Sequence, residues 1–156
     1  MNINVNNNHF QFLDFLSVEE SEIEKFQRLA GSYAVISCEG KFLICYNKWR
    51  NQWELPAGKR ERGETPKDCA ARELYEETGQ RVENLYFKGL LKVSNRSNGE
   101  LKFNPVYYGD LESLQPFYEN DEISSIMLWD TKKEIGYFDL IDLQVLKKFL
   151  KVPEKN

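Results

Sequence analysis

The distribution of hydrophobic and polar residues predicts that strands make up most of this chain. Short apolar runs alternate with clusters of Gly, Asn, Ser and Pro, which is the pattern of strands joined by turns. The predicted strands lie at residues 32–37, 41–46, 81–93, 101–109 and 123–129. Cys38-Glu39-Gly40 joins the first two as a hairpin. Pro105 lies within the fourth strand and predicts an edge strand or a bulge there.

Two segments carry the signals of helices. Thr65 is a good N-cap, Pro66 suits the first helical position and Gly79 suits a left-handed C-terminal cap, so we expect a helix over residues 66–78. Asp139 can cap a second helix that runs to about residue 151. The apolar stripe of this second helix comprises Leu140, Leu143, Leu146, Phe149 and Leu150.

Residues 1–30 form a leader before the strand-rich part of the chain. The apolar residues between positions 10 and 16 predict a strand-like patch, although they do not alternate cleanly. Ser17-Val18-Glu19-Glu20 predicts a capping box that opens a short helix ending near Leu29. The exposed aromatic residues could cover a sheet edge, bind a second copy of the chain as a homodimer, or pack on one another.

Length and charge restrict the class of protein. A chain of 156 residues with 41% hydrophobic residues fits one globular domain over residues 1–156. The net charge of −4 provides no electrostatic basis for binding duplex nucleic acid or an anionic membrane. No apolar run approaches the length of a transmembrane helix, and the N-terminus lacks the pattern of a signal peptide. We therefore expect a cytoplasmic protein that meets any anionic substrate through a metal ion and a few local cations.

Cysteine and histidine contribute little to the candidate chemistry. Cys38, Cys45 and Cys69 lack metal-binding or redox spacing, and their odd number argues against a disulfide framework. His9 is the only histidine in the sequence, which argues against a Cys-His nucleophile and a histidine-rich zinc or iron site. The remaining candidates for chemistry are carboxylates.

Three carboxylates gather on one side of the predicted helix 66–78. Glu73, Glu76 and Glu77 stand at i, i+3 and i+4, and they fall within an arc of about 100°. Like charges at this spacing oppose helix formation, and a divalent cation would compensate them. An acidic helix face is, by itself, more often a solvated surface.

The residues around this helix resemble the Nudix box over residues 53–80. Gly58 is followed after five residues by Glu64, and after seven more by Arg72-Glu73-Leu74-Tyr75-Glu76-Glu77-Thr78-Gly79. The family pattern ends in one further apolar residue, where this chain has Gln80, and Val82 could fill that gap. The resemblance to the Nudix hydrolase family (MutT-like) implies an α/β fold, an α/β/α sandwich with a mixed β-sheet.

The resemblance also implies a reaction and a set of site residues. Mg²⁺ or Mn²⁺ would be bound by the Ala57 carbonyl and by Glu73, Glu76 and Glu77. The expected reaction is hydrolysis of a diphosphate linkage in a small-molecule nucleoside diphosphate linked to another moiety. In this scheme Glu73 and Glu76 are catalytic, Arg72 orients a glutamate and Glu64 braces the loop against the helix.

Other candidate residues lie outside the aligned motif. Arg50 and Arg60 could bind substrate phosphates, and Tyr107 could stack on a base. Solvated loops and core packing are the alternatives for these side chains. Glu119 and Glu122 could supply a further acid from a loop beyond the motif, with a solvated turn as the alternative.

The motif leaves the substrate open. ADP-ribose or nucleotide sugars, and oxidised nucleoside triphosphates, are both compatible with the pattern. The alternative from another class is a non-catalytic Nudix-fold nucleotide sensor or binding module. Its mark would be loss of the helix glutamates, which are intact here.

Overall fold

The computed structural model describes residues 4–6, 9–26 and 29–150, which form a mixed sheet with helices. Strands in the first half are β1 (Asn4–Asn6), β2 (Phe10–Leu16), β3 (Ser32–Cys38), β4 (Lys41–Asn47), β5 (Gln52–Glu54) and β6 (Ala57–Gly58). Strands in the second half are β7 (Tyr86–Asn95), β8 (Leu101–Leu111), β9 (Ile123–Trp129) and β10 (Tyr137–Asp139). The helices are the 3-10 helix η1 (Glu20–Lys25), α1 (Pro66–Thr78) and α2 (Leu140–Lys147).

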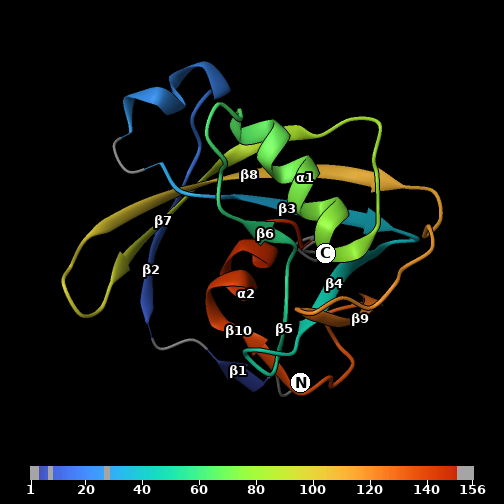
Figure 1. Ribbon diagram of the computed structural model, residues 1–156. Helices are drawn as coiled ribbons and strands as arrows, with labels where there is room; N and C mark the ends of the chain where they lie inside the picture. Colours follow the sequence, from blue (N-terminus) through green and yellow to red (C-terminus); the bar gives the residue numbers. More distant parts are fainter. Residues whose placement is uncertain (1–3, 7–8, 27–28, 151–156) are drawn as a thin grey trace, which may run out of the picture.

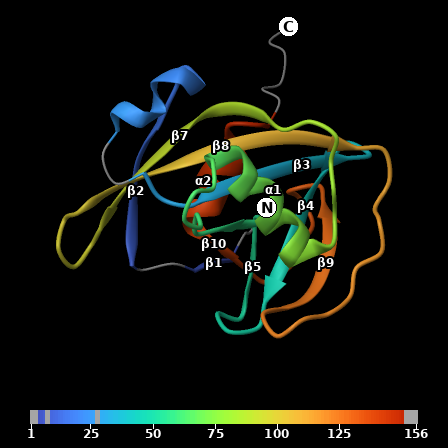
Figure 2. The ribbon, with the colours of Figure 1, turned by 45° about the horizontal axis from the view of Figure 1, so that its top comes forward.

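The strands form one branched sheet. Their order is β1-β10-β5-β4-β3-β8-β7-β2, with β6 added to β3 and β9 added to β4. The sheet is mixed, because β3 runs parallel to β8 and antiparallel to β4. Figures 1 and 2 show α1 beside β3 and β8, while α2 lies next to β10.

Two hydrophobic clusters lie on opposite faces of this sheet. Val35 belongs to the cluster that contains Ile141 and Leu146 of α2. Its neighbour Ile36 belongs to the cluster that contains Leu74 of α1. Successive residues of a strand point to opposite faces, so the two helices cover opposite sides of β3. The α/β/α sandwich expected from the sequence is confirmed.

Helix α1 has the bounds and caps that its sequence predicts. The Thr65 hydroxyl accepts a hydrogen bond from the Asp68 backbone N–H at 3.1 Å. Gly79 is left-handed with φ of 74°, and its N–H donates to the Tyr75 carbonyl at 2.8 Å. A Cβ on Gly79 would approach the Pro116 carbonyl oxygen to 2.8 Å, so glycine also lets the following loop lie close.

The leader covers the sheet edge, but its helix differs from the prediction. Strand β2 pairs with β7 at the end of the sheet, which is one of the alternatives considered for its aromatic residues. The predicted helix to Leu29 is wrong: η1 is a short 3-10 helix, and its capping box joins Glu19 to Glu22, not Ser17 to Glu20. Both ends of this segment are attached to β8, through a hydrogen bond from Tyr107 to Glu20 and the bridge from Leu29 to Phe103. Residues 27–28 lie outside the described residues.

Two strand predictions also need correction. The third predicted strand begins at Tyr86 instead of residue 81, although its bulge is confirmed between Phe87 and Gly89. Of the two alternatives predicted from Pro105, the edge strand is wrong because β3 and β7 flank β8, whereas the ladder with β7 does contain a bulge, in β7 and next to Val106. Pro105 is tolerated there because pairing between β3 and β8 begins only at Val106.

Helix α2 begins as predicted and ends early. The Asp139 side chain accepts from the Asp142 N–H at 2.9 Å, which confirms the cap. The helix ends at Lys147 instead of about residue 151, and the next residues form tighter turns. Leu150 is consequently 39% exposed, whereas Ile141 and Val145 are buried. Among the described residues, no helix has the length and hydropathy needed to cross a membrane.

Gln80 seals the end of α1 by hydrogen bonds instead of apolar packing. Its side chain is fully buried, and its Nε2 donates to the Thr78 and Gln115 carbonyls, each at 2.9 Å. Its Oε1 accepts from the Gln115 N–H at 2.7 Å. Val82 packs against the cluster beneath α1, as expected. Gln80 therefore fastens the loop of residues 112–122 to the helix.

Replacement of Gln80 by leucine, the apolar type of the family pattern, is expected to destabilise this chain. Two backbone groups of Gln115 would lose their partners, at a cost of about 1 to 3 kcal/mol in the free energy of unfolding. Urea denaturation measures this change. The same substitution at the half-buried Gln144 of α2 is the control, with a much smaller effect. Equal stability of Gln80→Leu and the wild type would contradict a stabilising role for the hydrogen bonds between Gln80 and Gln115.

Candidate active site

The acids of α1 border a cavity of about 510 Å³, here called the α1 cavity. Glu73 and Glu77 line it, together with Ala57 and Gly58 of strand β6, which precedes the helix. Glu122, from the loop beyond the motif, lines the same cavity. The sequence spacing therefore brings two of the three predicted helix acids together at one cavity.

Glu77 is the most enclosed of the helix acids. Its side chain is buried, with 5% of the residue exposed, and its Oε1 accepts from the Ala57 N–H at 2.8 Å. Burial raises the pKa of Glu77 well above its ordinary value, and the charges of Glu122 and Glu73 raise it further. A buried carboxylate surrounded by other acids is stabilised in its charged form by a bound cation.

Gly58 allows the loop and the helix to meet at the cavity. A Cβ on Gly58 would overlap the carboxylate of Glu73, so a larger residue would displace that acid. Burial raises the pKa of Glu73, while the neighbouring Arg72 opposes this effect. The glycine of the motif is thus required by the close approach of backbone and carboxylate.

Arg72 connects the loop to the helix acids. Its Nε and Nη2 donate to the two oxygens of Glu64 at 2.6 and 3.0 Å. Its Nη1 donates to Glu73 at 2.6 Å and to Glu76 at 3.1 Å, and Nη2 also donates to the Lys59 carbonyl at 2.8 Å. The guanidinium lowers the pKa of Glu64 to about 2. The positions of Arg72 and Glu64 fit the orienting and bracing roles predicted for them.

Glu76 lies apart from the other two acids. Its side chain is 54% exposed, is held by Arg72 and does not line the α1 cavity. Glu76 and Glu77 are adjacent in sequence, so one helical step of about 100° turns Glu76 toward solvent while Glu77 faces the loop.

The donors around the α1 cavity suit a hard divalent cation. Within the part of the chain that the structure describes, no three acidic, histidine or cysteine side chains converge closely enough to enclose an ion. Mg²⁺ commonly uses one or two carboxylates and completes its coordination with water and substrate phosphates. Glu73, Glu77 and the backbone of Ala57 provide oxygen donors of this kind beside the close contact at Gly58.

The two acids proposed from the later loop have different positions. Glu122 borders the α1 cavity and accepts from the Asn47 Nδ2 at 2.9 Å. Glu119 instead pairs with Lys48 at 3.0 Å, at the surface and outside the cavity. Glu122 is therefore the better candidate for the further acid.

Three cations also border the α1 cavity. Arg50 was a candidate from the sequence, and Lys59 and Lys102 lie beside it in the lining. Burial lowers the pKa of Lys102, with a further contribution from Lys59. Sequence reasoning missed Lys102, because only the course of β8 in the sheet brings it to the cavity that Glu73 and Glu77 line. These cations could meet the negative charge of a diphosphate.

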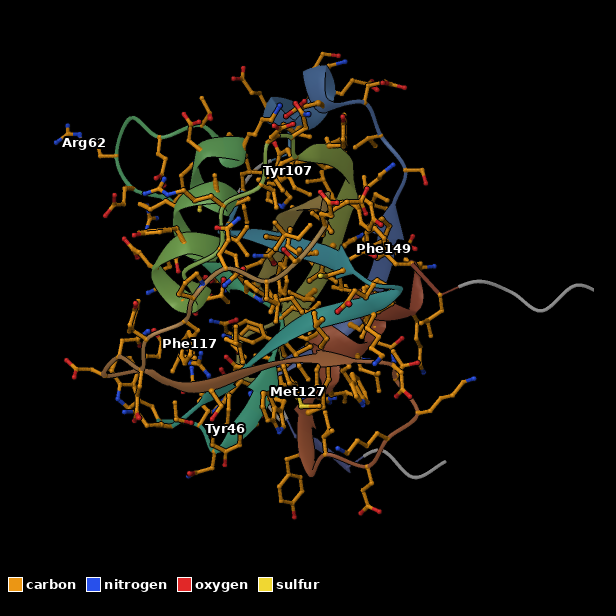
Figure 3. The ribbon with its side chains drawn as sticks, turned by 90° about the vertical axis from the view of Figure 1, so that its right-hand side faces the viewer. Tyr46, Arg62, Tyr107, Phe117, Met127 and Phe149 are labelled. Atoms are coloured by element: carbon orange, nitrogen blue, oxygen red, sulfur yellow. The ribbon has the colours of Figure 1, made fainter. Side chains whose placement is uncertain are left out.

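The two other predicted substrate contacts do not line the α1 cavity. Arg60 is exposed on the motif loop, and Figure 3 shows Arg62 of the same loop pointing away from the protein. Tyr107 is fully buried, and its hydroxyl donates to Glu20 at 2.7 Å. Its ring contacts Phe87, so Tyr107 packs in the core, the alternative considered for it.

A second cavity of about 470 Å³, here called the α2 cavity, adjoins the first. Both cavities are lined by Tyr33, Arg50, Ala57, Lys102 and Asn104, which makes them two lobes of one cleft. The α2 cavity has a polar wall that sequence reasoning missed. This wall contains Gln52, Glu54, Asp139 and Asp142.

Hydrogen bonds connect this polar wall to the α1 cavity. The Gln52 Nε2 donates to Glu54 at 2.6 Å and to Asp139 at 3.1 Å. Glu54 in turn accepts from the Arg50 Nε at 2.7 Å. Asp142 accepts from the Tyr33 hydroxyl at 2.9 Å, and burial followed by the charge of Asp139 raises the pKa of Asp142 well above its ordinary value. Both lobes of the cleft are thus lined by polar side chains that hydrogen bonds hold in place.

Comparisons with known proteins agree with this geometry. YtkD of Bacillus subtilis is 37% identical over 76 residues, which cover 49% of this chain and 46% of YtkD. A MutT-like protein of Streptomyces ambofaciens is 33% identical over 102 residues, covering 65% of this chain and 62% of that protein. The chain therefore spans about half to two thirds of the length of these curated relatives.

A solved structure shares the fold. The MutT NUDIX hydrolase from Burkholderia pseudomallei superposes with a TM-score of 0.67 at 22% identity, over 77% of this chain and 96% of that one. The model of the NUDIX domain family matches residues 25–150. This range includes α1, the loop of Glu122 and every residue that lines the two cavities apart from His9 and Phe10. Because this match spans well over half of the sequence, the chain belongs to the NUDIX family.

Proposed function

We propose that this protein hydrolyses a phosphoric anhydride, the diphosphate linkage of a nucleoside diphosphate joined to another group. The observation that carries the proposal is the lining of the α1 cavity, which contains both acids and cations. Glu73, Glu77 and Glu122 provide oxygen donors, while Lys59 and Lys102 provide positive charge. A diphosphate bound with a divalent cation requires both kinds of group.

The side chains divide the work in the proposed reaction. Glu73 and Glu77, with the Ala57 carbonyl, would hold Mg²⁺ or Mn²⁺, and Glu122 would add an acid from the loop beyond the motif. A bound divalent ion polarises a phosphoryl oxygen and makes a bound water easier to deprotonate. Arg72 and Glu64 keep Glu73 in place. A ligand or base role for Glu76 requires its side chain to leave Arg72 and turn toward the cavity.

The α2 cavity fits one of the two groups that the diphosphate of such a substrate joins. Its volume of about 470 Å³ falls in the range of small-molecule pockets, and its wall offers hydrogen-bonding groups at Gln52, Asn104 and Asp139. Arg50 and Lys102 line both cavities and could contact the phosphates between them. YtkD is provisionally named as an 8-oxo-dGTP diphosphatase, which supports testing oxidised nucleoside triphosphates beside ADP-ribose and nucleotide sugars.

A substrate panel with identified products tests the proposal. We expect release of a nucleoside monophosphate from ADP-ribose, a nucleotide sugar, a dinucleoside polyphosphate or oxidised dGTP. Removing divalent ions with a chelator should abolish turnover, and Mg²⁺ or Mn²⁺ should restore it. Binding of these nucleotides without turnover under any metal condition would contradict hydrolysis and favour the nucleotide sensor.

A further inference from the structure

Trp49 is a large aromatic side chain left exposed at the edge of the cleft. The residue is 67% exposed and lines the α1 cavity, in company with Glu122 and Lys59. The other two tryptophans are engaged elsewhere: Trp129 is buried, and Trp53 packs edge-on against Tyr46 at 5.4 Å. An exposed indole next to charged side chains presents a flat apolar face to whatever enters the cavity.

The backbone that carries Trp49 is held in place by the buried Asn47. The Asn47 Oδ1 accepts from the backbone N–H groups of Trp49 at 2.9 Å and Arg50 at 3.0 Å. The Asn47 Nδ2 donates to Glu54 at 3.2 Å and to Glu122 at 2.9 Å. The loop is thus tied to the walls of both cavities, so its indole needs little ordering when a ligand binds.

A second set of contacts holds the two sides of this loop. Lys48 pairs with Glu119 at 3.0 Å, and the Arg50 guanidinium pairs with Glu54 at 2.7 Å. The residues on both sides of Trp49 therefore have partners in the protein, while the indole between them faces the cavity edge. This arrangement favours a ligand-binding role over a solvated loop.

From this geometry we propose that Trp49 stacks on a nucleobase of the substrate, a proposal that rests on the hydrolase function proposed above. Trp49 lines only the α1 cavity and is absent from the lining of the α2 cavity. It therefore borders the lobe that contains the acids and not the lobe that contains the polar wall of Gln52 and Asp139. A planar base joined to a diphosphate matches both the flat indole and the adjacent cations. Stacking on an aromatic side chain suits any base, so Trp49 would add affinity with little preference between bases.

Intrinsic fluorescence provides a test that needs no turnover. With excitation at the red edge of the indole band, ADP should quench the wild-type protein, whereas pyrophosphate, which lacks a base, should not. Trp49→Ala should lose this quenching and bind ADP about 5- to 150-fold more weakly, with unchanged affinity for pyrophosphate. Trp49→Tyr should recover most of the affinity, because tyrosine also stacks.

Two further comparisons complete the test. Tyr118→Ala, at an exposed aromatic residue outside both cavities, should bind ADP like the wild type. A diadenosine polyphosphate added to the titration separates the two possible bases: quenching by this ligand but not by ADP would assign Trp49 to the second nucleoside.

The proposal is overturned if no base-bearing ligand quenches Trp49, or if Trp49→Ala weakens ADP and pyrophosphate equally. It is also overturned if the variant binds ADP normally but changes the oligomeric state in light scattering, which would assign the indole to a contact between copies. If ADP quenches the wild-type protein but no nucleotide of the substrate panel is hydrolysed, only the hydrolase function is contradicted.

Discussion

Replacement of Glu77 by glutamine is expected to reduce turnover by at least about 100-fold while the protein stays folded. Changes to groups that merely orient a metal ligand commonly cost 10- to 100-fold, so loss of a proposed ligand should cost more. The amide oxygen can still accept from the Ala57 N–H, which binds Glu77 at 2.8 Å. The neutral side chain also removes the cost of burying a charge, so stability should be equal or slightly higher.

Steady-state kinetics at saturating Mg²⁺, together with thermal unfolding, measures both parts of this result. The matched control is Glu119→Gln, because it makes the same chemical change at an acid that binds Lys48 outside the cavity. We expect Glu119→Gln to retain nearly full activity. Equal activity of Glu77→Gln and the wild type would remove Glu77 from the metal site and leave Glu73 and Glu122 as the acids to test.

The second large effect is expected for Arg72→Lys. Lysine keeps the charge but cannot form the fork that joins Glu64, Glu73 and the Lys59 carbonyl. We expect kcat to fall by about 10- to 100-fold, because Glu73 loses the group that positions it. The side chain of Arg72 is only 22% exposed, so losing these charged hydrogen bonds should also lower the free energy of unfolding by about 1 to 3 kcal/mol.

A positioning role for Arg72 can be separated from a direct contact with substrate. A double-mutant cycle with Glu64→Gln should give a coupling energy of about 0.5 to 3 kcal/mol in stability, because the two side chains share two hydrogen bonds. Arg60→Lys on the exposed part of the same loop should change neither activity nor stability. Zero coupling between positions 64 and 72 would contradict the bracing network, and an unchanged kcat in Arg72→Lys would contradict the positioning of Glu73 by Arg72.

The two substitutions test different parts of the proposed metal site. Glu77 tests the acid that faces the cavity, whereas Arg72 tests the connection between the loop and Glu73. If Arg72→Lys lost stability but kept kcat, the network would be structural only. If Arg72→Lys lowered kcat without lowering stability, the contacts of Arg72 would matter for the position of Glu73 and not for the stability of the fold.

Much of the fold was predictable because its signals are local. The caps at Thr65 and Gly79 defined helix α1 to the residue, since they satisfy backbone groups within one turn. The hairpin of β3 and β4 followed from a short turn containing glycine, and Gly40 is indeed left-handed with φ of 76°. The errors at η1, β8 and the end of α2 arose where contacts with distant segments override local pattern, as for Tyr107 with Glu20.

The candidate site was predictable where one helix carries it and unpredictable where several strands meet. Helical spacing placed Glu73, Glu76 and Glu77 on one arc, but packing against the loop decided that Glu77 is buried and Glu76 is exposed. Gln80 was a departure from the family pattern in the sequence. Only the structure shows that its hydrogen bonds to Gln115 attach the loop of Glu122 to the end of α1.

The sequence by itself determined the family, the motif helix and the carboxylates on it, because spacing along a helix converts directly into position on its surface. Tertiary structure alone decided the rest of the cleft, namely Lys102, Trp49, the polar wall with Asp142, and the choice of Glu122 over Glu119 as the further acid. These residues come from separate strands and loops that are far apart in the chain. Strand register and loop course bring them together, and neither is encoded in the local periodicity around any one of them.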